Sequence, residues 1–119
     1  MGKHNEFGKE GEQMAVDFLI DAGYKIRCRN YRYLKSEIDI IAQKEAILVV
    51  VEVRARSNDQ IIPIADTITS KKIKLLVMGA DHYVTTNKLD VEVRFDIITI
   101  LKNKKIFKIE HLENAFYHF

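Results

Sequence analysis

The chain has 119 residues and a formal net charge of +2, from 19 lysines and arginines against 17 aspartates and glutamates. This length suits one domain with its own hydrophobic core and is too short for two, so we expect a single domain over residues 1–119. The nearly balanced charge does not by itself indicate a nucleic-acid-binding protein. Any such function must depend on local clustering of basic side chains.

The sequence has no feature typical of a membrane protein or a secreted protein. The N-terminus is polar, and neither a signal peptide nor an apolar stretch of membrane-spanning length is present. The single cysteine, Cys28, excludes an internal disulfide bond. We therefore expect a cytoplasmic protein that has no membrane partner.

The first predicted elements are a helix and a strand. Apolar residues recur at helical spacing from Phe7 to Ala22, and Gly23 is a natural stop for an amphipathic helix. From Tyr24 to Tyr33 apolar and basic residues alternate, which predicts a half-exposed strand.

The remaining pattern predicts four more strands and a second helix. The strands are expected at 37–42, 46–56, 91–101 and 106–109, with a short turn at 43–45, a loop from Ser57 to Pro63, and a helix capped by Thr69 or Ser70. The order is helix, three strands, helix, two strands. This order predicts an α/β fold with a mixed central sheet of about five strands flanked by helices.

Four charged residues flank the most apolar segment of the chain, Ile47–Val51. Glu37 and Asp39 lie on the strand before it, and Glu52 and Arg54 follow it directly. Because side chains alternate along a strand, each pair shares one face. Charge at the end of a buried strand is costly unless it is paired or functional, so these residues are the first candidates for a site.

The register of the predicted hairpin decides whether the two pairs can act together. A turn centred on Lys44 and Glu45 would place Asp39 opposite Val50 and bring both charged pairs to one face. Glu37 would then lie opposite Glu52. A register shift of one residue would instead separate Asp39 and Glu52 onto opposite faces.

Two interpretations of these charges remain open. Like charges facing each other need a cation, and either Arg54 or a divalent metal could supply it. Magnesium takes one or two protein carboxylates, which Asp39 and Glu52 would provide, and it would activate water for attack on a phosphodiester. The alternative is a structural ion pair of these acids with Arg54 or Arg56.

The first helix offers a third acid, Glu12. This residue falls at the edge of the apolar stripe, beside the small residues Gly8, Gly11 and Ala15. Small neighbours leave room for a carboxylate to reach inward, or for another backbone to approach closely. The alternative is a solvated helix flank, since Asp21 borders the same stripe from the other side.

Several motifs together resemble the YraN-like family of uncharacterised bacterial proteins. The motifs are Gly11-Glu12, Gly23-Tyr24, Arg29-Asn30-Tyr31, Glu37-Ile-Asp39, Val51-Glu52-Val-Arg54-Ala-Arg56, Lys71 and Val93-Arg94-Phe95-Asp96. The likeness extends from about residue 6 to the C-terminus. That family in turn resembles archaeal Holliday-junction resolvases and the wider restriction-endonuclease-like (PD-(D/E)xK) nucleases.

The resemblance implies a restriction-endonuclease-like αβββαβ core and a particular active site. It implies Asp39 and Glu52 as ligands of Mg²⁺ or Mn²⁺, Glu12 as a helix-borne acid, and position 54 as the catalytic cation. It also implies DNA as partner and a homodimer, because a DNA junction has two symmetric cutting sites.

The chain departs from the nuclease pattern at Arg54, where active nucleases usually have lysine. Arginine keeps the charge and can bind phosphate through two parallel hydrogen bonds, but it cannot act as a general base near neutral pH. Lys71, at the start of the second helix, could supply the missing amine or a phosphate contact. Arg56 and Lys71 are the predicted nucleic-acid-binding residues, although Lys71 could equally be an ordinary exposed lysine.

Two further groups of charged residues have both structural and functional interpretations. The basic residues from Lys25 to Lys35 alternate with tyrosines, which suits either a nucleic-acid backbone or a solvated strand face. Arg94 and Asp96 share a strand face, and a structural pair is favoured. The leading hypothesis is thus a magnesium-dependent endonuclease acting on DNA, with branched or damaged DNA as candidate substrates. The alternatives are an inactive nucleic-acid- or protein-binding module of the same fold, or a structural partner in a bacterial complex.

Overall fold

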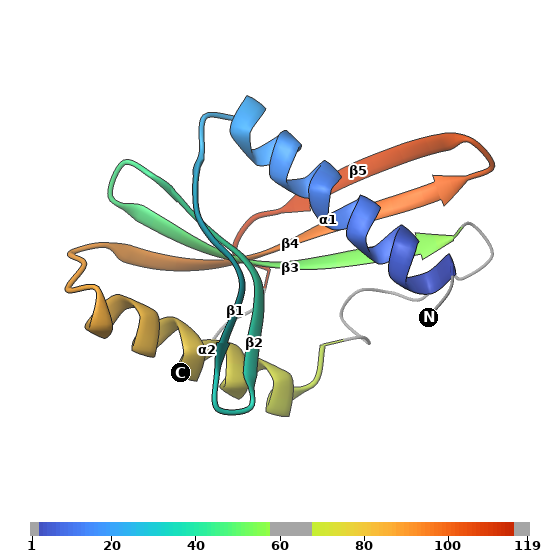
Figure 1. Cartoon of the computed structure of the whole chain (residues 1–119). Helices are drawn as coiled ribbons and strands as arrows, with labels where there is room; N and C mark the ends of the chain where they lie inside the picture. Colours follow the sequence, from blue (N-terminus) through green and yellow to red (C-terminus); the bar gives the residue numbers. More distant parts are fainter. Residues whose placement is uncertain (1–2, 58–67, 116–119) are drawn as a thin grey trace.

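The structure, a computed structural model, describes residues 3–57 and 68–115 (Figure 1). Its elements are α1 (Lys3–Asp21), β1 (Lys25–Tyr33), β2 (Ser36–Lys44), β3 (Ile47–Ser57), α2 (Ser70–Thr86), β4 (Glu92–Asn103) and β5 (Ile106–Leu112). The predicted order of elements is confirmed. The predicted loop at Ser57–Pro63 lies outside the described residues except for Ser57, which is the last residue of β3. Neither described helix is long and apolar enough to cross a membrane.

The five strands form one mixed sheet in the order β1-β2-β3-β4-β5. Neighbouring strands are antiparallel except β3 and β4, which are parallel and are connected through α2. A parallel pair needs such a crossover connection, and this explains why a helix interrupts the series of strands. The expected α/β fold with a mixed five-stranded sheet is therefore confirmed.

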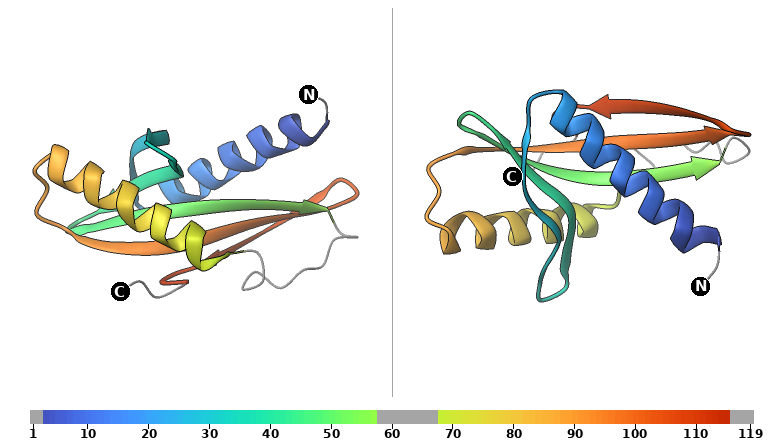
Figure 2. Two further views of the ribbon diagram at one scale, coloured as in Figure 1. Left: turned by 90° about the horizontal axis from the view of Figure 1, so that it is seen from below. Right: turned by 45° about the horizontal axis from the view of Figure 1, so that its top comes forward.

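The two helices pack on opposite faces of the sheet, and each covers its own core (Figure 2). Ala15, Val16 and Leu19 of α1 pack against Val49 and Val51 of β3. Leu76, Ala80 and Tyr83 of α2 pack with Leu48, Val50 and Phe95 on the other side. Because β3 is buried on both faces, its apolar run is continuous rather than alternating.

The hairpin of β1 and β2 leaves the sheet halfway along its length. Pairing between β2 and β3 ends at Ile40 and Val51, and the outer part of the hairpin crosses over α2. There the buried Ser36 donates a hydrogen bond from Oγ to the carbonyl oxygen of Leu75 at 2.6 Å. Gly79 of α2 lies directly against Ser36, and a side chain at this position would collide with it. Among the described residues, the edge of β3 beyond Val51 therefore has no strand paired with it on the β2 side, and the candidate site lies at this open edge.

The predicted register of β2 and β3 is wrong by two residues, yet the predicted faces survive. The turn falls at residues 45–46, where Glu45 adopts a φ of +55°. Val50 consequently pairs with Ile41 rather than with Asp39. Since the shift is an even number of residues, Asp39 stays on the same face as Glu52.

Glu37 is not part of the charged group, contrary to the prediction. Because pairing of β2 with β3 ends at Ile40, Glu37 does not lie opposite Glu52. It pairs with Arg32 of β1 instead, at 3.3 Å, and its side chain is 60% exposed. Its ion pair therefore lies on the solvated outer part of the hairpin.

Arg94 and Asp96 form the expected structural pair, and they do so within a larger buried network. Asp96 is fully buried and accepts hydrogen bonds from Arg94 Nε and Nη2, both at 2.9 Å. His111 Nε2 lies 2.7 Å from Asp96, and the backbone N–H of Asn114 donates to it at 2.9 Å. Arg94 also donates to the hydroxyl of Tyr24 at 2.6 Å. The network joins the segment after α1 to β4 and to the end of β5.

Candidate metal and nucleic-acid site

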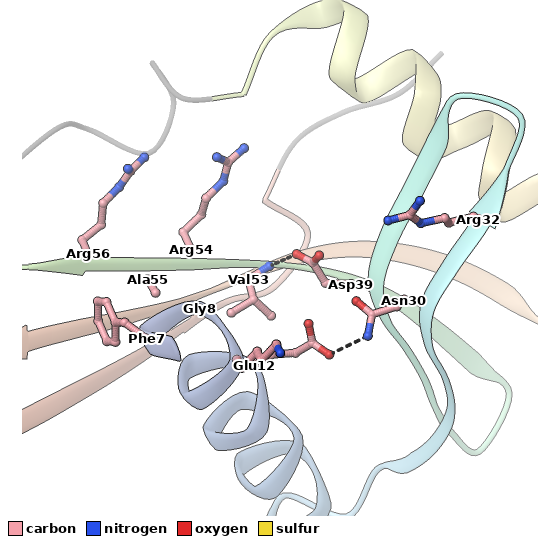
Figure 3. Close-up of a pocket in the computed structure, with 11 residues that line it drawn as sticks. Phe7, Gly8, Glu12, Asn30, Arg32, Asp39, Val53, Arg54, Ala55 and Arg56 are labelled. Carbon is pink, nitrogen blue, oxygen red and sulfur yellow. Dashed lines mark hydrogen bonds between the residues drawn. The ribbon is translucent and has the colours of Figure 1, made fainter. Parts of the chain in front are cut away.

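A cavity of about 640 Å³ occupies the gap where β2 leaves β3 (Figure 3). Its walls come from the first half of α1, the β1–β2 hairpin and the open edge of β3. Two acids line it, Glu12 and Asp39, together with four basic residues: Lys9, Arg32, Arg54 and Arg56. The cavity therefore combines carboxylates with an excess of positive charge.

Asp39 is positioned by the open edge of β3. The backbone N–H of Val53 lies just beyond the last residue paired with β2, and it donates to Asp39 Oδ2 at 2.8 Å. The carboxylate thus replaces the missing strand as hydrogen-bond partner. Burial raises the pKa of Asp39 above its ordinary value, the charge of Glu12 adds to the increase, and the hydrogen bond from Val53 opposes it.

Glu52 lies beside the cavity, on the face of β3 that α2 covers. Its side chain is only 8% exposed, and Oε2 lies 3.1 Å from Arg54 Nη2 and 3.7 Å from Lys72 Nζ. Oε1 is buried and makes no hydrogen bond to any described residue. Burial raises the pKa of Glu52 to about 6, and the charge of Asp39 contributes to this increase. The structure therefore brings the two predicted ligands close enough for the charge of Asp39 to act on Glu52.

Lys72 belongs to this group and was not singled out from the sequence. Its neighbour Lys71, the predicted contact, is exposed, whereas Lys72 points toward Glu52. Helical spacing indicates that Lys72 lies on the buried face of α2, because it precedes the buried residues Leu76, Ala80 and Tyr83 by four, eight and eleven positions. Extending the apolar face of α2 by one turn would have selected Lys72.

Glu12 reaches the same cavity from α1 and is held by the hairpin. Its Oε1 accepts hydrogen bonds from Arg29 Nε at 3.2 Å and from Asn30 Nδ2 at 3.1 Å. The close approach anticipated from small residues occurs at Gly11, where an added Cβ would lie 3.2 Å from Ala55 Cβ. Gly8 has no neighbour among the described residues within 4 Å of such an atom, so it makes no close packing contact there.

The basic residues of β1 are mostly engaged within the protein. Arg27 donates to the Tyr83 hydroxyl at 3.1 Å, and Arg29 is paired with Glu12. Tyr33 stacks on the ring of His82 at 3.6 Å. Of the basic residues in this run, only Arg32 lines the cavity, and Arg56 of β3 joins it there.

The donor atoms at Asp39 and Glu52 fit a hard divalent cation. Carboxylate oxygens suit Mg²⁺ and Mn²⁺, and Mg²⁺ uses one or two protein carboxylates together with water. The buried Oε1 of Glu52, which has no hydrogen-bond partner among the described residues, is the kind of atom that a metal ion would satisfy. Residues 3–57 and 68–115 contain no group of three or more acidic, histidine or cysteine side chains placed to hold a metal.

Comparison with known proteins places this chain in a family. The model of the uncharacterised protein family UPF0102 matches residues 11–100, which include the cavity acids, Glu52 and Lys72. The chain belongs to this family. The resemblance to YraN-like proteins, expected from the motifs, is thereby confirmed.

Relatives in this family match over all or nearly all of their length. A UPF0102 protein of Flavobacterium psychrophilum is 52% identical over 119 residues, covering all of both chains. A UPF0102 protein of Christiangramia forsetii is 48% identical, again over all of both chains. One from Phocaeicola vulgatus is 47% identical over 117 residues, covering 98% of this chain and 97% of its own.

The raised pKa of Glu52 predicts how stability depends on pH. Between the ordinary value of 4.5 and about 6, the folded protein binds more protons at Glu52 than the unfolded chain does. The contribution of this residue to the free energy of unfolding therefore falls as the pH rises through this window. We expect urea unfolding at pH 4.5, 5.5 and 6.5 to show a downward trend that is weaker in Glu52→Gln. An identical trend in the wild type and in Glu52→Gln would contradict the assignment.

Proposed function

We propose that this protein is a metal-dependent endonuclease that hydrolyses phosphodiester bonds in DNA. The observation that carries the proposal is the pair Asp39 and Glu52, two largely buried acids of raised pKa beside a cavity rimmed with cations. Perturbed acids gathered in a cavity are typical of catalytic centres. The resemblance of the sequence motifs to restriction-endonuclease-like nucleases supports the same conclusion.

Each residue has a role that follows from its chemistry. Asp39 and Glu52 would hold Mg²⁺ or Mn²⁺, and when bound, this ion would polarise the phosphodiester and lower the pKa of a water molecule. Glu12, fixed by Arg29, presents a second carboxylate to the same cavity and would orient water or assist a second ion.

Phosphate binding would depend on the basic rim of the cavity. Arg54 and Arg56 lie on the strand that carries Glu52, and Arg32 and Lys9 line the cavity from the hairpin and from α1. Arginine can bind a phosphate through two parallel hydrogen bonds, which would position a backbone beside Asp39. The exposed Lys71 would extend the contact along α2.

One observation favours a second candidate, an inactive nucleic-acid- or protein-binding module. The cation at position 54 is an arginine held on Glu52 at 3.1 Å, and arginine cannot transfer a proton near neutral pH. A protein that retained the basic cavity without the reaction would have this arrangement. The endonuclease and a nucleic-acid-binding module would share the DNA surface and differ only in chemistry.

The test is cleavage of a panel of labelled duplex, flap and four-way-junction DNAs. The purified protein would be incubated with Mg²⁺, with Mn²⁺ or with EDTA, and its oligomeric state would be followed by light scattering with and without DNA. We expect cleavage that requires the metal and favours branched DNA, with a homodimer on the junction. DNA binding without cleavage would support the inactive module, and the absence of both would contradict the two nucleic-acid functions.

A further inference from the structure

Lys72 occupies a position that the helix itself disfavours. It lies in the first turn of α2, where Thr69 caps the helix by accepting the Lys72 backbone N–H at 3.1 Å. The positive end of the helix dipole is at this terminus, so an ammonium group there is unfavourable. The negative charge of Glu52 offsets this disadvantage, which makes the location of Lys72 dependent on Glu52.

The contact between Lys72 and Glu52 is loose compared with that of Arg54. Lys72 Nζ lies 3.7 Å from Oε2, beyond a good hydrogen-bond distance, whereas Arg54 Nη2 lies at 3.1 Å. The Lys72 side chain is 33% exposed and Glu52 only 8%. Lys72 therefore approaches the buried acid from the solvent side, and its flexible stem allows it to leave without disturbing the sheet.

The charges of Asp39, Glu52, Arg54 and Lys72 balance one another only while no divalent cation is present. Asp39 and Glu52 supply two negative charges, and Arg54 and Lys72 supply two positive charges. Two added positive charges at the acids would repel both basic side chains. Lys72 lies at the longer distance from Glu52, and Arg54, which contacts the same carboxylate oxygen, lines a cavity whose four basic residues suit an anion.

We propose that Lys72 is an exchangeable cation of this site, which neutralises Glu52 in the metal-free protein and turns to a substrate phosphate when a divalent ion takes its place. This inference rests on the proposed function, because it requires Asp39 and Glu52 to hold the ion. Lys72 would then compete with the metal ion for Glu52 and, in the metal-loaded protein, would contact the DNA backbone.

The first test measures Mn²⁺ binding in the absence of DNA, by electron paramagnetic resonance of the free ion. Wild type, Lys72→Met and, as a matched control, Lys71→Met would be compared at pH 8. Removing a positive charge beside the ion should tighten Mn²⁺ binding by about three- to tenfold in Lys72→Met. Lys71→Met should stay near the wild type. Thermal unfolding would show that all three proteins are folded.

The second test measures DNA binding by the Mn²⁺-loaded proteins, using a fluorescent duplex with a phosphorothioate backbone. Lys72→Met should bind about three- to tenfold more weakly than wild type, and Lys72→Arg should retain most of the affinity. Weaker Mn²⁺ binding by Lys72→Met, a change in Mn²⁺ binding equal to that of Lys71→Met, or an unchanged DNA affinity of Lys72→Met would overturn the inference. No Mn²⁺ binding by the wild type would overturn both the inference and the proposed metal ligands. The expected Mn²⁺ and DNA results without DNA cleavage would overturn the endonuclease activity alone.

Discussion

Asp39→Asn and Glu52→Gln are expected to lose metal-dependent cleavage by about 100-fold or more and, at pH 7, to be more stable than the wild type. Cleavage is lost because an amide has no charge to hold the ion. Stability rises because burial makes both ionised acids unfavourable. For Glu52, a pKa increase from 4.5 to about 6 corresponds to about 2 kcal/mol of unfolding free energy.

The two substitutions keep the local geometry. In the wild type, the backbone N–H of Val53 donates a hydrogen bond to Asp39 Oδ2 at 2.8 Å. The side-chain oxygen in Asp39→Asn can still accept this hydrogen bond. Glu110→Gln is the matched control, since Glu110 lies on β5 with a side chain that is 56% exposed, and it should change neither quantity. Cleavage rates and urea unfolding would be measured on the same preparations. A loss of stability in both variants would instead identify the acids as structural partners of the neighbouring cations.

Asp96→Ala is expected to cause the largest loss of stability in the molecule, about 3–5 kcal/mol. The substitution removes the fully buried acceptor of Arg94, His111 and the N–H of Asn114 at once. Hydrogen bonding to Asp96 raises the pKa of Arg94 above its ordinary value, so this guanidinium would stay charged and lose its buried acidic partner. Urea unfolding of the variant and of the wild type gives the difference.

Two companion variants make the Asp96 result specific. Asp81→Ala removes an exposed acid from α2 and should change the free energy of unfolding by less than about 0.5 kcal/mol. Asp96→Asn keeps the shape of the side chain but loses the charge, and should lie between Asp96→Ala and the wild type. A loss below about 1 kcal/mol for Asp96→Ala would mean that the network contributes little to stability.

The order of elements was predictable because each has a strong local signal. The helical spacing before Gly23 and the alternation before Tyr33 depend only on near neighbours in the chain. The register of β2 and β3 was not predictable in this way. It depends on Glu45 adopting a left-handed backbone conformation, which this residue type does not indicate. The departure of the hairpin from the sheet depends on Ser36 meeting Gly79, a contact between distant parts of the sequence.

The candidate site was predictable as far as it depends on the alternation of side chains along each strand. Asp39 and Glu52 share a face in any register that differs by an even number of residues, so the wrong register did not separate them. Choosing Lys72 over Lys71 required the orientation of α2. The apolar residues of α2 encode this orientation, but the predicted apolar face was not extended to the first turn of the helix. Whether these residues hold a metal and cut DNA stays a prediction.

The central position of β3 has a consequence for how the chain folds. Its apolar segment Ile47–Val51 pairs with β4, which comes later in the sequence, after the whole of α2. Parallel pairs between distant segments form slowly, so we expect the β4-facing edge of this stretch to stay unpaired late into folding, when it can associate with other chains. Glu45 and Glu52 flank the segment and act as charged gatekeepers against such aggregation. Glu52→Gln should therefore refold with a greater tendency to aggregate even though its native state is more stable.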